Sequence, residues 1–187
     1  MVAARAFHND PFFEYLEPNG VRRARALALL WRAELAALGP TAQVTGARGA
    51  DGRLVGVGVW VPPGGYPLPA TAQARQLVGA LRAMCLRPPA LWDGVRYLLA
   101  IEKAHPKEPI WYLMLLVVDP SAQRSGIGGR LQQSGTEAAD RGGLDCYLET
   151  QKADNVPYYR RFGYEVAKEL IPVPSGPHLW TMRRPSS

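Results

Sequence analysis

The chain has 187 residues, a length that suits one domain over residues 1–187. Its formal net charge of +6 at pH 7 suits an anionic partner. The arginines that carry this charge are scattered and are not interleaved with an aromatic binding motif, so we expect no nucleic-acid partner. Cys85 and Cys146 belong to no CxxC or Cys/His cluster, which predicts no metal site, no disulfide and a cytoplasmic location.

The first half of the chain shows helix signals around one hairpin. Residues 10–13, Asp-Pro-Phe-Phe, indicate a turn with exposed aromatic side chains. Pro18-Asn19-Gly20 is a breaker, and a helix is predicted after it. Its apolar stripe at helical spacing runs from residue 27 to 38, and Gly39-Pro40 ends it. The elements that follow are a hairpin of strands 43–48 and 53–61, a proline- and glycine-rich loop over 62–67, and two helices that end before the proline-containing segments 87–89 and 105–106.

The rest of the chain is organised around residues 110–142. The apolar run from Ile110 to Val118 predicts a strand buried on both faces, and it is far too short to cross a bilayer, so no membrane partner is expected. Pro120 cannot continue the strand because it has no N–H donor. A glycine-rich turn follows, and a helix is predicted from about Gly126 to Gly142. Strand, glycine turn and helix in this order suit phosphate binding, since the first helical turn favours negative charge.

Four more elements complete a mixed α/β pattern. Residues 144–150 form a predicted strand that can lie parallel to the apolar strand through the helical crossover. A short helix is predicted over residues 156–162. Strands 165–173 and 178–183 then close the chain as an antiparallel pair.

The glycine turn has three chemical interpretations. A P-loop is excluded because no Gly-Lys-Ser/Thr follows. A dinucleotide site is suggested by Gly126, Gly128 and Glu149, although the third glycine position is Leu131 and too little chain follows for a doubly wound sheet. The third interpretation is a site for an acyl-coenzyme A.

Two separated motifs resemble those of the GNAT superfamily of N-acetyltransferases. The first is Val118-Asp119-Pro120 followed by Gln123-x-x-Gly126-x-Gly128, and the second is Asn155 with Tyr159 four residues before Gly163. From about His105 onward, the chain is most similar to puromycin N-acetyltransferase-like actinobacterial members. The resemblance implies the GNAT acyltransferase fold, with helices on both faces of a central, mixed and mostly antiparallel sheet and a splayed parallel strand pair. It also places the family's first strand and most of its first helix before Met1, so we expect either that the sequence starts late or that the domain lacks one sheet strand.

The resemblance further implies a reaction and a set of site residues. Acetyl would pass from acetyl-CoA, the cosubstrate, to a primary amine of a small molecule such as an aminonucleoside antibiotic, by direct attack in a ternary complex. Tyr159 would be the general acid and Glu149 the general base, with Glu102 second. The residues implied to bind acetyl-CoA are Leu116, Val117, Val118, Gln123, Arg124, Ser125, Gly126, Ile127, Gly128, Gly129 and Asn155. Aromatic residues expected to rim the amine pocket are Trp60, Tyr66, Trp111 and Tyr112.

Simpler interpretations stand beside these roles. Asn155 could cap the short helix, Tyr159 could be core packing, and Glu149 could be a strand-end carboxylate paired with an arginine. Asp10 and His105, each before a proline, are interpreted as turn residues. The alternative functions are acetylation of a protein lysine or N-terminus, and a non-catalytic coenzyme A-binding module. Either a monomer or a homodimer is compatible with the sequence.

Overall fold

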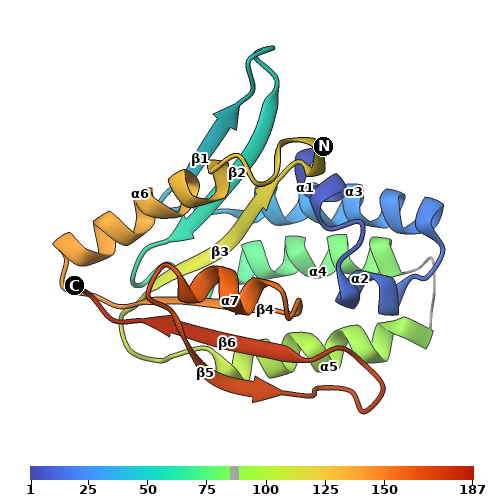
Figure 1. The fold of residues 1–187 in the computed structure, drawn as a ribbon. Coiled ribbons are helices and arrows are strands. Elements are labelled where there is room, and N and C mark those ends of the chain that lie inside the picture. Colours follow the sequence, from blue (N-terminus) through green and yellow to red (C-terminus); the bar gives the residue numbers. More distant parts are fainter. Residues whose placement is uncertain (85–88) are drawn as a thin grey trace.

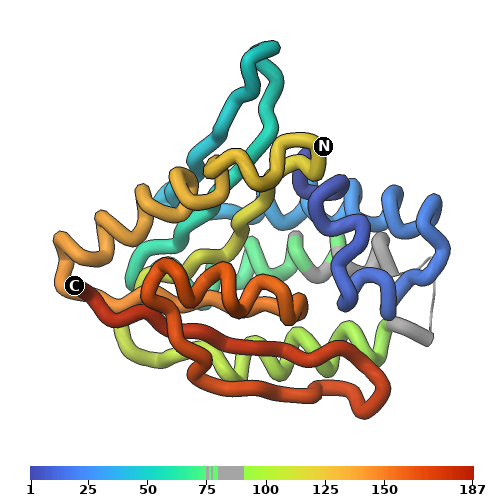
Figure 2. Tube along the Cα trace, in the orientation of Figure 1, coloured from blue at the N-terminus to red at the C-terminus, as the bar shows by residue number. Residues whose placement is uncertain are grey.

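The computed structural model describes residues 1–84 and 89–187 (Figures 1 and 2). Cys85 and the predicted helix end at residues 87–88 lie outside this range. The helices are α1 (Val2–Ala6), α2 (Pro11–Leu16), α3 (Gly20–Ala37), α4 (Ala70–Met84), α5 (Pro89–Ala104), α6 (Ile127–Arg141) and α7 (Asn155–Arg160), with a 3-10 helix η1 over Pro120–Ala122. The strands are β1 (Gln43–Arg48), β2 (Leu54–Val61), β3 (Trp111–Val118), β4 (Cys146–Thr150), β5 (Glu165–Leu170) and β6 (Leu179–Arg184). None of the helices described combines the length and apolar character that a membrane crossing requires.

Side-chain caps set the starts of α2 and α3. The carboxylate of Asp10 accepts a hydrogen bond from the N–H of Phe12 at 3.0 Å, and Pro11 occupies the first helical position. The predicted turn over residues 10–13 is therefore wrong, because aspartate before proline is also a helix-start signal. Asn19 caps α3 in the same way, so the helix begins at Gly20, within the segment that was predicted to be a breaker before it.

The described strands form one sheet in the order β1-β2-β3-β4-β6-β5. Neighbouring strands are antiparallel except for β3 and β4, which are parallel. The predicted mixed, mostly antiparallel sheet, its hairpin over β1 and β2 and its last antiparallel pair are confirmed.

The parallel pair stays together only at its start. Trp111 pairs with Cys146 and Tyr112 with Tyr147, and no further register partners join the two strands. Beyond this point the edge of β3 that faces β4 has no strand partner in the described part of the chain. This divergence is the splayed pair that the resemblance implied.

A β-bulge lies in β3 at the same level. Val59 of β2 pairs with Leu115, whereas the next residue, Trp60, pairs with Leu113, so Met114 is an extra residue. The bulge changes which side chains of β3 face each side of the sheet. Leu113 packs with Trp60, whereas Leu115 packs with Val59 on the opposite face.

Helices cover both faces of the sheet (Figure 1). The α6 and α7 helices pack on one face through a core that contains Trp60, Trp111, Leu113, Leu148 and Tyr159. The α1 and α3 helices pack on the other face through Leu27, Trp31, Val59, Leu115 and Val117. The α4 helix lies along α3, and α5 packs against the β5–β6 end through Tyr97 and Leu179.

Candidate active site

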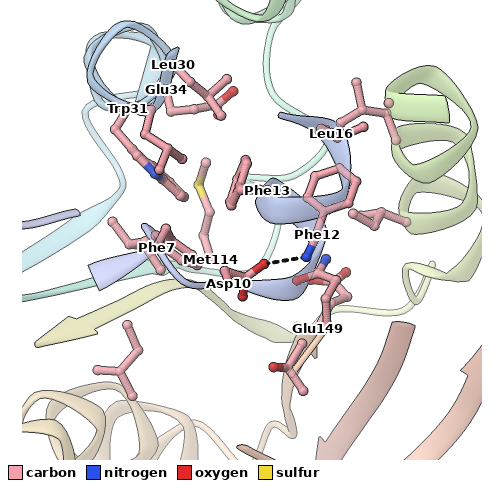
Figure 3. Close-up of a pocket in the computed structure, with 18 of the residues that line it drawn as sticks. Phe7, Asp10, Phe12, Phe13, Leu16, Leu30, Trp31, Glu34, Met114 and Glu149 are labelled. Atoms are coloured by element: carbon pink, nitrogen blue, oxygen red, sulfur yellow. Dashed lines mark hydrogen bonds between the residues drawn. The ribbon is translucent and has the colours of Figure 1, made fainter. Parts of the chain in front are cut away.

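A cavity of about 440 Å³ lies where β3 and β4 diverge (Figure 3). Its walls come from α2, α3, α4 and α5 and from β3, β4 and α7. Met114 and Leu115 line it from the α3 face of the sheet, whereas Leu116 and Tyr159 line it from the α7 face. The cavity therefore reaches through the plane of the sheet, so groups that approach from opposite faces can meet inside it.

The chain turns from β3 into α6 through an exposed loop. Arg124 has φ 62° and Gly126 has φ 78°, both in the left-handed region. The side chain of Gln123 donates a hydrogen bond to the carbonyl of Val118 at 3.1 Å, so this glutamine braces the loop. The first N–H groups of α6, over residues 127–129, have no acceptor within the helix. Such a bend into a helix start forms a concave anion cradle.

Gly128 and Gly129 let α6 lie close to α7. A Cβ on Gly128 would lie 2.7 Å from the hydroxyl oxygen of Tyr158, and one on Gly129 would lie 3.3 Å from the ring of Phe162. The cradle is therefore held against α7 by residues that leave no room for side chains. The residues predicted to bind pyrophosphate, Gln123 to Gly129, all lie in this loop and first turn.

Asn155 and Tyr159 lie on the same short helix and both line the cavity. The side-chain amide of Asn155 donates to the hydroxyl of Thr150 at 2.9 Å, which ties the start of α7 to the end of β4. The N-cap position belongs to Asp154, so the interpretation of Asn155 as the cap is wrong. Tyr159 is 7% exposed, and no hydrogen bond within the described residues engages its hydroxyl. Burial raises the pKa of Tyr159 above that of an ordinary phenol, so the proton stays on the oxygen.

Glu149 lies at the end of β4 beside a cluster of aromatic rings. Its side chain is 6% exposed, and its Oε1 atom has no hydrogen-bond partner in the described part of the chain. The Nδ1 atom of His105 lies 3.7 Å from that oxygen. Burial, together with the charge of Glu149, raises the pKa of Tyr112 and of Tyr147, so both phenols remain neutral. Glu149 forms no ion pair with an arginine among the described side chains, so the simpler interpretation of it as an arginine-paired carboxylate is wrong.

His105 is more than a turn residue. Its ring packs against Tyr66, Tyr112 and Tyr147, with centroids 4.1 to 5.0 Å apart. The side chain is 8% exposed and faces Glu149 from the end of α5. Sequence reasoning missed this contact because α5 and β4 are far apart in the chain.

Two further carboxylates on the cavity wall were also missed. Asp10, interpreted as a turn residue, is 8% exposed, and burial raises its pKa to about 6. Glu34 of α3 lines the cavity, and burial raises its pKa to about 7. An Asp-Pro helix start could have revealed the cap role of Asp10, but only the packing of α4 on α3 buries Glu34.

The aromatic residues predicted to rim the pocket separate into two pairs. Tyr66 and Tyr112 line the cavity. Trp60 and Trp111 instead lie in the core under α6, where the indole of Trp60 fills the space beside Gly135. The second candidate base, Glu102, accepts a hydrogen bond from the Tyr66 hydroxyl at 2.8 Å.

Residues 75–166 match the family model of the acetyltransferase (GNAT) domain. This part of the chain carries a GNAT acetyltransferase domain. This domain is that of acetyl-CoA-dependent N-acetyltransferases, and the chain is accordingly such an enzyme.

Solved structures share the GNAT fold over most or all of this chain. Histone acetyltransferase HPA2 and related acetyltransferase from Corynebacterium glutamicum ATCC 13032 is 22% identical, with a TM-score of 0.68, and the match covers 100% of this chain and 88% of that one. Arylalkylamine N-acetyltransferase 2 from Aedes aegypti is 14% identical, with a TM-score of 0.56 and coverage of 100% and 93%. Nourseothricin acetyltransferase is 19% identical, with a TM-score of 0.50 and coverage of 79% and 67%. At these identities the likeness establishes the fold alone.

Acetyltransferases with the GNAT domain use acetyl-CoA as their cosubstrate, and this site fits that molecule. The left-handed turn at Arg124 and Gly126 leads into the first N–H groups of α6, and this arrangement suits the pyrophosphate. The unpaired edge of β3 offers backbone groups to an extended amide chain such as pantetheine.

Proposed function

We propose that the chain transfers acetyl from acetyl-CoA to the primary amine of a small molecule, by direct attack while both substrates are bound. The cavity that reaches through the sheet is the observation that carries this proposal. Because its lining includes side chains from both faces of the sheet, the cosubstrate would approach from the α7 face and the amine from the α3 face. Two bound substrates can then react without a covalent enzyme intermediate. Cys146, the one described thiol, is fully buried, and burial raises its pKa to about 11, which opposes a role as nucleophile.

The chain would hold acetyl-CoA with backbone groups. Leu116, Val117 and Val118 would pair with the pantetheine arm along the free edge of β3. The N–H groups over Gln123 to Gly129 would bind the pyrophosphate, and Asn155 would fix the distance between β4 and α7. When bound, the thioester supplies an activated acyl group.

Glu149 and Tyr159 would move the two protons of the reaction. The Glu149 carboxylate would accept a proton from the incoming ammonium, directly or through water, because its Oε1 atom has no competing hydrogen bond in the described structure. Tyr159 would donate its phenolic proton to the sulfur as the carbon–sulfur bond breaks, and the proton that the nitrogen loses as the amide forms would restore the phenol. The burial that raises its pKa also disfavours a free thiolate in the same cavity, so the driving force for this transfer is retained.

The helices and the apolar side chains around the cavity support a small acceptor over a protein lysine or N-terminus. Helices α2 to α5 supply much of its wall, and Phe7, Phe12 and Phe13 make that wall largely apolar. An aminonucleoside antibiotic such as puromycin is a candidate acceptor, in keeping with the resemblance of residues 105–187 to puromycin N-acetyltransferase-like members. One structure with the same fold is named nourseothricin acetyltransferase, which also fits a small acceptor.

A thiol-release assay tests the proposal. Free coenzyme A would be measured with puromycin, aminoglycosides, polyamines and a lysine peptide, with an amine-free reaction as the control. We expect turnover with at least one small amine and none with the peptide. Preference for the peptide would establish protein acetylation instead. Tight binding of acetyl-CoA without any turnover would establish a binding module.

A further inference from the structure

The cavity lining has a charge opposite to that of the whole chain. Four of the described lining residues carry carboxylates, Asp10, Glu17, Glu34 and Glu149, whereas one carries a guanidinium, Arg23. The chain as a whole has a net charge of +6. Such a separation of charge attracts cations to the cavity and anions to the surface.

The positive charge of Arg23 is already engaged. Its Nε atom donates to the carbonyl of His8 at 2.6 Å, and Nη1 donates to the carbonyl of Glu17 at 2.8 Å. Its other terminal nitrogen pairs with Glu14 at 3.5 Å. Arg23 therefore holds the α2–α3 connection together and forms no ion pair with Asp10, Glu34 or Glu149 in the described structure.

Glu34 lies on the α3 wall without a cationic partner among the described side chains. Its Oε2 atom accepts a hydrogen bond from the side-chain amide of Gln76 at 2.5 Å, which joins α3 to α4. An amide donor compensates a buried negative charge only in part. Consistent with this, burial raises the pKa of Glu34 to about 7.

Asp10 lies on a second wall, at the start of α2. Its carboxylate accepts the N–H of Phe12, as Figure 3 shows, and it forms no ion pair in the described structure. Lys152 lies near enough to lower its pKa slightly, but burial outweighs this and raises the pKa to about 6. Asp10 therefore also gains from a cation that enters the cavity.

Glu149 completes the arrangement on the β4 wall. Its side chain is 6% exposed, and Oε1 has no hydrogen-bond partner within the described residues. Figure 3 shows Glu149, Asp10 and Glu34 on separate walls around one cavity. Between them lie apolar side chains, namely Phe7, Phe12, Phe13, Leu30, Trp31 and Met114.

We infer that the acceptor is an amphiphilic amine with an apolar body and at least two cationic groups. The amine that reacts lies by Glu149, and the second cation lies by Asp10 and Glu34. This inference rests on the proposed function, and it narrows the acceptor from any small amine to a dicationic or polycationic one. Asp10 and Glu34 are then specificity-determining residues that do not touch the reacting atoms.

A matched pair of amines tests the inference. Octylamine and 1,8-diaminooctane share an apolar chain and differ by one ammonium group. We expect the wild-type enzyme to have a kcat/KM about 10- to 100-fold higher for the diamine, because each desolvated charge pair contributes strongly. Glu34→Gln keeps a hydrogen-bonding group for Gln76 and should remove most of this preference while the rate with octylamine stays within about twofold.

Asp10→Asn provides a second variant, since asparagine still caps a helix. Glu137→Gln, on the exposed side of α6, is the matched control and should leave the preference intact. Calorimetric binding of both amines in the presence of coenzyme A gives a readout that does not depend on turnover.

The outcomes separate the inference from the proposed function. Equal use of both amines by wild type and variants would overturn the inference and leave the proposed function standing. Binding of the diamine that depends on Asp10 or Glu34, without acetylation of either amine, would support the charge inference and overturn the proposed function. Neither binding nor turnover of either amine would overturn both.

Discussion

Replacing Tyr159 with phenylalanine removes one hydroxyl from the cavity and nothing from the core. The ring packs edge-on against Tyr158 and Tyr164, with centroids 5.1 and 5.8 Å away, and phenylalanine keeps both contacts. No hydrogen bond within the described residues would be lost with the hydroxyl. The free energy of unfolding should therefore change by less than about 0.5 kcal/mol.

The catalytic effect of the same change should be large. A positioned general acid contributes about 10²- to 10⁴-fold, so the barrier should rise by roughly 3–5 kcal/mol. The assay compares kcat for thiol release, the Kd for acetyl-CoA by calorimetry and the melting temperature. We expect Tyr159→Phe to lose kcat while its Kd and melting temperature stay near those of wild type.

Tyr164→Phe is the matched control. Its hydroxyl is also without a hydrogen-bond partner in the described structure, but the residue is 1% exposed in the core and does not line the cavity. This variant should keep kcat within about threefold of wild type, because its hydroxyl lies away from the site. If Tyr159→Phe also keeps kcat within that margin, Tyr159 is not the proton donor and the assignment is refuted.

Three further predictions concern binding and stability. Gly126→Ala should weaken acetyl-CoA binding about tenfold, because φ is 78° and an alanine in that conformation lowers stability by about 1–2 kcal/mol. Gly143→Ala is the control. Its φ is 61° and no atom lies near its Cβ position, so it should lose similar stability while the Kd for acetyl-CoA stays unchanged. The folded pKa of Glu34, about 7, lies above its ordinary value of 4.5, so its contribution to stability is present below pH 4.5 and is lost as the pH rises through 7. Glu34→Gln should therefore stabilise the free protein by up to about 3 kcal/mol at pH 8 and have little effect at pH 4. Thermal unfolding at the two pH values measures this difference. The same gain in stability at pH 4 and at pH 8 would contradict the raised pKa of Glu34. Gln132 is fully buried on α6 with no partner for its amide in the described structure, so Gln132→Met should raise the free energy of unfolding by about 1–3 kcal/mol in urea titrations, and a loss of stability would show that the amide is satisfied.

The elements that the sequence predicted well depend on local signals. The nine-residue apolar run predicted β3, and the glycine-rich turn with its amphipathic continuation predicted α6 to within a residue or two at each end. The hairpin over β1 and β2 followed from residues 49–52 and the alternation around them. Each of these signals lies within a few residues of the structure that it specifies.

The parts of the site that escaped prediction depend on contacts distant in sequence. Glu34 is one polar position on an amphipathic helix, and it is half-buried where α4 packs along α3 and Gln76 donates a hydrogen bond to it. His105 faces Glu149 across 44 residues of chain, so a histidine before a proline carried no sign of that contact. The turn predicted at Asp10 failed for another reason, since the same residue pair specifies either a turn or a helix start.

The bulge at Met114 has a consequence for how this enzyme could change its acceptor. Side chains before residue 105 build most of the wall around the amine, whereas the segment from Leu116 to Tyr159 supplies the proposed cosubstrate contacts and the proton donor. The bulge lies at the junction of these two segments. Exchange of residues 1–104 for the matching part of a relative should therefore change the acceptor specificity of the enzyme and leave its acetyl donor unchanged. Deletion of Met114 would remove the bulge and leave Leu113 and Leu115 as neighbours that still face opposite sides of the sheet, at the cost of the Met114 side chain on the cavity wall.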